Sequence, residues 1–100
     1  ALQIREALAG ASPHDTQVRR DLAASYHKIG MQMLETNDAA SGMDYLRKAI
    51  AIQEAIAADL PVDAEIRQEL AAGYIGLGYA LEDSGDAAGA LESHRKALAV

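Results

Sequence analysis

The sequence contains no cysteine, no tryptophan and no phenylalanine, and only 2 of its 100 residues are proline. Without cysteine there is neither a disulfide framework nor a thiolate metal site, and a cytoplasmic location is the expectation that fits this composition. Basic residues are also few, since 9 Lys and Arg stand against 15 Asp and Glu, giving a net charge of −6. Because nucleic acids and anionic membrane surfaces attract basic faces, we expect neither of them to be the partner.

Long apolar runs are absent as well. No run approaches the roughly 20 residues needed to span a bilayer, although 50% of the residues are hydrophobic. Alanine fills 22 positions and leucine 11, and this composition favours helix because alanine gives up no side-chain entropy. The sequence therefore predicts an all-α chain whose length allows one domain.

An ungapped internal repeat with a period of 48 residues organises the whole sequence. When the chain is overlaid on itself at this offset, 20 of the 52 overlaid positions are identical, and residues 19–26 fall on 67–74. A fixed period of this length indicates stacked supersecondary units. We expect one helical-repeat domain over 1–100 that belongs to a longer array. Its parts are the end of a preceding repeat (1–15), a complete repeat (16–63) and a truncated repeat (64–100).

Apolar residues recur at helical spacing within each unit. The stripe in the second copy is formed by Ile66, Leu70, Tyr74, Leu77 and Leu81. Polar turns at 36–38 and 84–86 interrupt the stripes, as do Pro13 and Pro61. Asp15 and Asp63 are placed to cap the helices that follow the prolines. The predicted helices are 1–11, 16–35, 39–59, 64–83 and 87–100.

The spacing of aromatic and small residues resembles the tetratricopeptide repeat family. The second copy carries this signature at Tyr74, Leu77, Gly78, Leu81, Ala90, His94 and Ala97. The first copy carries it at Tyr26, Ile29, Gly30, Met33, Gly42, Leu46 and Ala49. The resemblance implies an α-solenoid of antiparallel helix pairs. The period is 48 residues where the family has 34, and so the chain is similar to the long-helix arrays of bacterial signalling proteins, including the tails of serine/threonine kinases.

The glycine and alanine positions of this signature predict close contacts between helices. Gly30, Gly42, Gly78 and Ala90 stand where a side chain larger than methyl would force two helix axes apart. The glycine-rich segment 73–78 is interpreted in the same way. No strand precedes it, so a phosphate-binding loop is not favoured.

No arrangement of residues indicates catalysis. The three histidines, His14, His27 and His94, are not at helical spacing from one another, so we expect no metal site. No serine has a histidine and an aspartate at a spacing that would activate it. We therefore expect a protein that is not an enzyme and that needs no cofactor.

The resemblance also implies a partner-binding groove lined by the first helix of each repeat. The positions that carry it here are His27, Met31, Leu34, Ile75, Tyr79 and Glu82. They are mostly apolar, which favours an apolar or amphipathic peptide or helix of a partner protein, with Met31 and Tyr79 as adaptable contacts. The alternative is that these residues pack against adjacent repeats of the same chain.

Two classes of function remain open from the sequence. The first is a non-catalytic protein–protein interaction scaffold that binds a partner in the groove. The second is a self-assembly or spacer module, or the regulatory tail of a larger bacterial signalling protein, in which open repeat ends associate with further repeats or with another copy as a homo-oligomer.

Overall fold

The computed structural model describes residues 2–11, 15–60 and 62–100, and this part of the chain contains five helices and no strand. The helices are α1 (Leu2–Ala11), α2 (Thr16–Glu35), α3 (Ala39–Asp59), α4 (Ala64–Asp83) and α5 (Ala87–Ala99). The all-α prediction is confirmed, and α2, α3 and α4 have the predicted bounds. Pro13, His14 and Pro61, with the helix stops predicted at the two prolines, lie outside the described residues. No described helix is both long and apolar enough to cross a membrane.

Aspartate side chains begin the four helices from α2 to α5. Asp15 and Asp63 cap α2 and α4, as predicted, and Asp38 and Asp86 cap α3 and α5. In each case a carboxylate oxygen accepts a hydrogen bond from the backbone N–H three residues further on, at 2.8–3.3 Å. These bonds satisfy donors that the first helical turn leaves without partners and so fix where each helix starts.

The two tight turns have the same geometry in both repeats. Asn37 after α2 and Gly85 after α4 adopt positive φ angles of 64° and 91°, a conformation that glycine and asparagine tolerate best. The backbone N–H of the next residue, Asp38 or Asp86, donates to a carbonyl of the preceding helix at 2.9 and 2.8 Å respectively. This pairing ends the helix and turns the chain back on itself.

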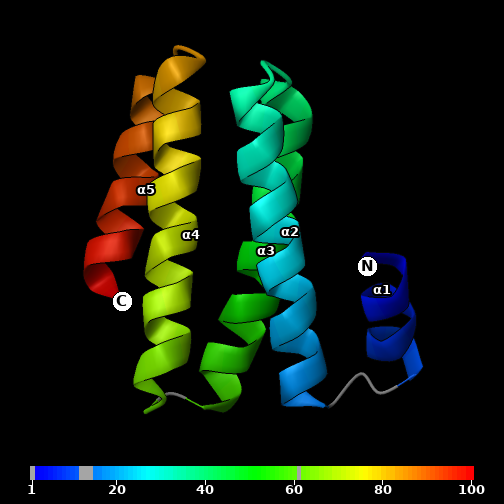
Figure 1. Cartoon of the computed structure of the whole chain (residues 1–100). Helices are drawn as coiled ribbons and strands as arrows, with labels where there is room; N and C mark the ends of the chain where they lie inside the picture. Colours follow the sequence, from blue (N-terminus) through cyan, green and yellow to red (C-terminus); the bar gives the residue numbers. More distant parts are fainter. Residues whose placement is uncertain (1, 12–14, 61) are drawn as a thin grey trace.

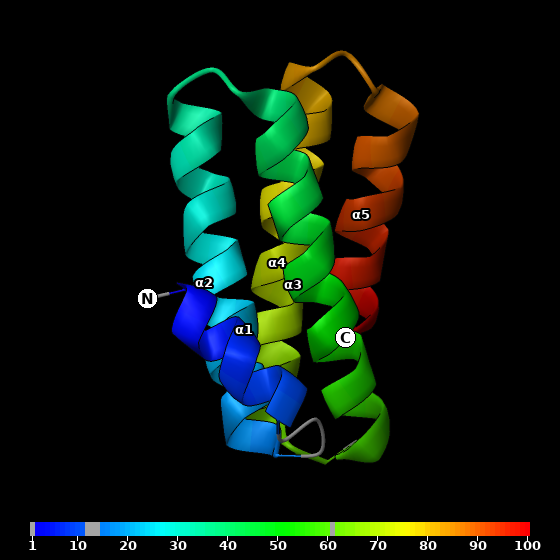
Figure 2. The same ribbon diagram turned by 90° about the vertical axis from the view of Figure 1, so that its right-hand side faces the viewer.

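Each helix packs against the next one along the chain, and neighbours run in opposite directions (Figure 1). The order across the molecule is α1, then α2 with α3, then α4 with α5, so that α1 and α5 lie at opposite edges (Figures 1 and 2). The Cα atoms occupy 38 × 30 × 15 Å, which is a flattened shape. A flattened arrangement leaves each inner helix with neighbours on more than one side.

Two apolar clusters hold these helices together. The larger one joins α3 to α4 and α5, and its buried members are Leu46, Ile50, Leu70, Tyr74, Leu77, Leu81 and Ala90. The smaller one joins α2 to α3 through Leu22, Ala23, Tyr26 and Ala49, with Leu2 of α1 packed against it. Helix α3 takes part in both clusters and so links the packing of the two repeats.

Side-chain contacts recur with the period of the sequence. The Tyr26 hydroxyl donates to Glu6, and the Tyr74 hydroxyl donates to Glu54 in the matching position. A lysine ammonium lies 5.6 Å from the first ring centroid and 5.9 Å from the second. Burial, followed by the hydrogen bond to the carboxylate, raises the pKa of each of these tyrosines to about 12. The repeat seen in the sequence is therefore also a repeat of contacts.

Two glycines let the backbones of α2 and α3 come close together. A Cβ atom added to Gly30 would lie 2.8 Å from the carbonyl oxygen of Gly42, and one added to Gly42 would lie 2.8 Å from that of Gly30. In the second repeat, a Cβ on Gly78 would lie 2.7 Å from Cε1 of His94. The close contacts predicted at these glycines are confirmed. The obstacle is backbone in the first repeat and a side-chain ring in the second.

We predict that Gly30→Ala lowers the free energy of unfolding by about 1–3 kcal/mol, because neither helix backbone can yield to the new methyl group without moving the pair apart. Urea unfolding followed by circular dichroism measures the change. Gly10→Ala is the matched control, since a Cβ there has no neighbour within 4 Å, and it should stabilise α1 by up to about 1 kcal/mol. Equal stability of Gly30→Ala and the unaltered chain would show that α2 and α3 are not in backbone contact.

Candidate partner-binding site

The structure separates the six predicted groove residues into two groups. His27 and Met31 lie on the side of α2 that faces Gly76 of α4. Leu34 lies close to Gly42 of α3 and borders a hollow with Ala80 and Asp83 of α4. Ile75, Tyr79 and Glu82 lie on α4 and border hollows shared with α5. The six residues therefore do not line one continuous cavity.

The first group is partly covered by the neighbouring repeat. A Cβ atom on Gly76 of α4 would lie 3.3 Å from Sδ of Met31 and 3.7 Å from Cε1 of His27. Leu34 packs against the larger core cluster. These residues contact α4 and are also partly exposed. Their surroundings therefore fit both alternatives stated above, binding of a partner segment and packing against the adjacent repeat.

The second group borders the open side of the last helix pair. Ile75 and Tyr79 line a hollow with His94, Ala97 and Leu98. Glu82 lines an adjacent hollow with Ala87, Ala90, Leu91 and His94. The Tyr79 and His94 rings meet edge to face, with their centroids 5.3 Å apart. This surface is apolar, apart from Glu82 and the histidine.

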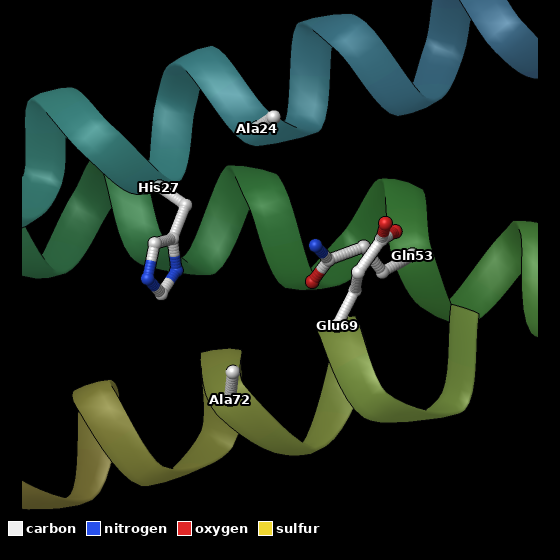
Figure 3. Close-up of a pocket in the computed structure, with 5 residues that line it drawn as sticks. All are labelled: Ala24, His27, Gln53, Glu69 and Ala72. Atoms are coloured by element: carbon white, nitrogen blue, oxygen red, sulfur yellow. The ribbon is translucent and has the colours of Figure 1, made fainter. Parts of the chain in front are cut away.

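A pocket of about 180 Å³ opens between α2, α3 and α4, and it is lined by Ala24, His27, Gln53, Glu69 and Ala72. Figure 3 shows the three polar side chains reaching into the space between the helices, one from each helix. Ala24 and Ala72 are exposed and border it on α2 and α4. Their small side chains leave the pocket open.

Gln53 is the unusual member of this pocket. Its side chain is 4% exposed, yet its carbonyl oxygen Oε1 accepts no hydrogen bond from the described residues. A buried acceptor without a donor costs about 1–3 kcal/mol. Gly73 of α4 lies close to Oε1, since a Cβ atom added there would be 3.2 Å away. A donor from outside the chain would relieve this cost.

Glu69 gives the pocket its charge and is held in place by Arg20 of α2. The guanidinium lies 3.0 Å from the Glu69 carboxylate, 2.9 Å from that of Glu65 and 3.9 Å from that of Asp63. The hydrogen bond to Glu69 is the largest of the effects that raise the pKa of Arg20. Since three carboxylates share one guanidinium, this side of the pocket remains acidic.

His27 closes the other side of the pocket, and burial lowers the pKa of its imidazole below the ordinary value of 6.5. The ring is therefore neutral at neutral pH and can donate through one nitrogen and accept through the other. Together the three polar groups offer acceptors at Gln53 and Glu69 and an adaptable partner at His27. The described residues contain no group of three His, Asp or Glu side chains suited to a metal ion.

Of the residues that line this pocket, the sequence predicted only His27. The signal for Gln53 was nevertheless present, because it stands among apolar positions of α3 that include Ile50 and Ile56, both buried. A polar residue inside an apolar stripe must find a partner or remain unsatisfied. Glu69 gave no comparable signal, since only the packing of α4 beside α2 brings it to the pocket.

Comparisons of this chain with models of known protein families, with curated proteins and with solved structures gave no match.

We predict that His27 makes the chain less stable in mild acid. Because its pKa is lower in the folded state, the unfolded state binds more protons below about pH 6.5, and stability rises with pH through that range. His27→Gln should give a flatter dependence of unfolding free energy on pH between about pH 5 and 7. Urea titrations at several pH values test this. Parallel curves for the two chains would contradict a buried, neutral His27.

Proposed function

We propose that the chain is a tetratricopeptide-like α-solenoid, built from antiparallel helix pairs, that serves as a non-catalytic scaffold for protein–protein interaction. The partner segment, a peptide or a helix, lies along the face shared by α2 and α4. His27, Met31 and Leu34 contribute to this face from the first repeat, and the pocket beside His27 takes one side chain of the partner.

The recurrence of contacts supports the repeat assignment. The caps, the positive-φ turns and the tyrosine–glutamate hydrogen bonds each occur twice, 48 residues apart. Such recurrence is expected when each unit solves the same packing problem against its neighbour. The recurrence favours stacked repeats over a helix bundle in which the contacts differ from one helix to the next.

The observation that carries the binding proposal is the unpartnered carbonyl of Gln53 in an open pocket. At about 180 Å³, the pocket is smaller than the ~300–1,000 Å³ typical of small-molecule sites, and this size fits a single side chain of a peptide. The last torsion of glutamine is soft, so a small rotation presents Oε1 to a bound donor. With Glu69 beside it, the favoured donor is the N–H of a lysine, arginine or amide side chain.

Self-assembly or a spacer role is the second candidate function. The observation that favours it is the exposure of Tyr79 and Leu98 on the outer side of the α4–α5 pair. Exposed apolar side chains that are grouped in this way often form a contact surface for another protein segment. This role uses a different face from the pocket, and one chain can combine both.

We predict that Gln53→Leu stabilises the folded chain by about 1–2 kcal/mol while weakening partner binding, because leucine removes an unsatisfied buried acceptor at similar volume. Thermal unfolding measures the first effect. A gain in stability with unchanged binding would show that the pocket has no part in recognition. A loss of stability would show that Gln53 is satisfied in solution by bound water.

We also predict that a random peptide library displayed on phage will yield binders that require the pocket. Ala72→Arg should block its mouth and abolish their binding, since Ala72 is exposed and the change leaves the core intact. Ala88→Arg, at an exposed position on α5, is the matched control and should bind normally. Failure to enrich any peptide, or binders indifferent to Ala72→Arg, would contradict the proposed site.

A further inference from the structure

One face of the α2–α3 pair is covered by α4, and it shows how a helix packs on such a face. Leu46 and Ile50 of α3 are 0% and 5% exposed, because α4 lies over them. Met31 of α2 contacts the same helix at Gly76. The outer face of the α2–α3 pair is thus an interface already formed within the structure.

The helix that covers this face does so with small residues. A Cβ on Gly73 would lie 3.0 Å from Cγ1 of Ile50, and one on Gly76 would lie 3.3 Å from Sδ of Met31. Ala80, one helical turn further, is buried. Small residues at positions i, i+3 and i+7 therefore let α4 sit close to the large side chains of the preceding pair.

The same face recurs on the α4–α5 pair, displaced by 48 residues, and no described residue covers it. Leu98 matches Ile50, which is 5% exposed, but is itself 89% exposed. Tyr79 matches Met31, which α4 covers only in part (37% exposed), and is 61% exposed. Together with Ile75, His94 and Ala97 they border an apolar hollow of about 330 Å³. This surface, termed the terminal face, is the continuation of the interface that α4 closes on the first pair.

We propose that the terminal face binds a helix of the α4 type. That helix carries glycine or alanine at positions i, i+3 and i+7 and begins a further helical hairpin. Its small stripe lies over Tyr79 and Leu98, as Gly76 and Gly73 lie over Met31 and Ile50 within the chain. The assignment concerns a different surface from the pocket at Gln53. It rests on the proposed stacking of repeats and specifies the occupant of the surface named for self-assembly, while binding at the pocket is tested separately.

Another copy of this chain is a poorer occupant than an α4-type helix. In α2, the first helix of the other repeat, Ser25, Lys28 and Gln32 occupy the positions of the small stripe. Lys28 and Gln32 are larger and polar, and both are exposed. Placing them over Tyr79 and Leu98 would bury polar groups against an apolar surface at considerable cost.

A charged contact lies at the border of the interface between the two helix pairs. Between the two pairs, Arg20 joins α2 to the acidic start of α4, with contacts to Glu65 and Glu69. On the terminal face the matching position is Gln68, which has no charge to offer an acidic helix start. The apolar contact therefore provides most of the binding there, and a cation at residue 68 should strengthen it.

The experiment uses the full chain extended by a second copy of residues 53–100, which keeps the period of 48. Since the sequence has no cysteine, Leu98→Cys introduces a single reporter thiol. Its rate of reaction with a thiol reagent is compared in the extended and unextended chains, at several protein concentrations. Glu92→Cys is the matched control, because its counterpart Asp44 stays exposed although α4 packs on α3.

We expect Leu98→Cys to react about tenfold more slowly or slower still in the extended chain, because the thiol is then reached only when the interface opens. Glu92→Cys should react equally in both chains. In the extended chain, leucine in place of the appended glycine that matches Gly76 should restore fast reaction while circular dichroism shows that the helices persist. Equal rates for Leu98→Cys in the two chains would overturn the proposal. Protection of the unextended chain that disappears on dilution would overturn it as well, in favour of a second copy as occupant.

Adding Gln68→Arg to the extended chain is the test of the charged border. The arginine recreates the position of Arg20 opposite an acidic helix start, so the protection of Leu98→Cys should increase severalfold at low salt and fall back in high salt. A protection factor unchanged by Gln68→Arg at any salt concentration would show that the added unit does not sit in the repeated position.

Discussion

The contact between α3 and α4 is the interaction on which the rest of the structure depends. Each helix hairpin carries apolar side chains on more than one side, so packing its two helices together leaves further apolar surface to cover. Leu46 and Ile50 on one hairpin and Tyr74 and Leu77 on the next remove that surface from water jointly. Burying a large side chain is worth about 1.5–3 kcal/mol. This contact therefore joins the two hairpins into one folded unit and sets the spacing at which the pocket forms.

The pocket is a consequence of that spacing. Because α4 approaches α3 through Gly73, the carboxamide of Gln53 is enclosed, while Ala24 and Ala72 are too small to close the mouth between α2 and α4. A polar group in this position costs stability, and a protein selected for stability alone would carry an apolar residue there. The combination of an unsatisfied acceptor and an open pocket is the physical basis of the proposal that this face binds a partner.

Much of the fold was predictable from sequence because its determinants are local. The aspartate caps and the positive-φ residues Asn37 and Gly85 fixed the helix ends, and the doubled stripes predicted which faces are buried. The pocket was not predictable in the same way. Glu69 reaches it only because α4 lies beside α2. The periodicity within one helix does not predict which helix lies beside it. The placement of Met31 against Gly76 likewise depends on how two distant segments meet.

The most direct test of stacked repeats is a nuclear Overhauser measurement between the Met31 methyl group and the α-protons of Gly76 in the folded chain. If α4 closes the face of α2 and α3, these protons lie close enough to give a cross-peak, and the Ile50 methyl groups give another to Gly73. The absence of both cross-peaks from a well-resolved spectrum, with contacts from Met31 only to its own helix, would contradict stacking of the second hairpin on the first.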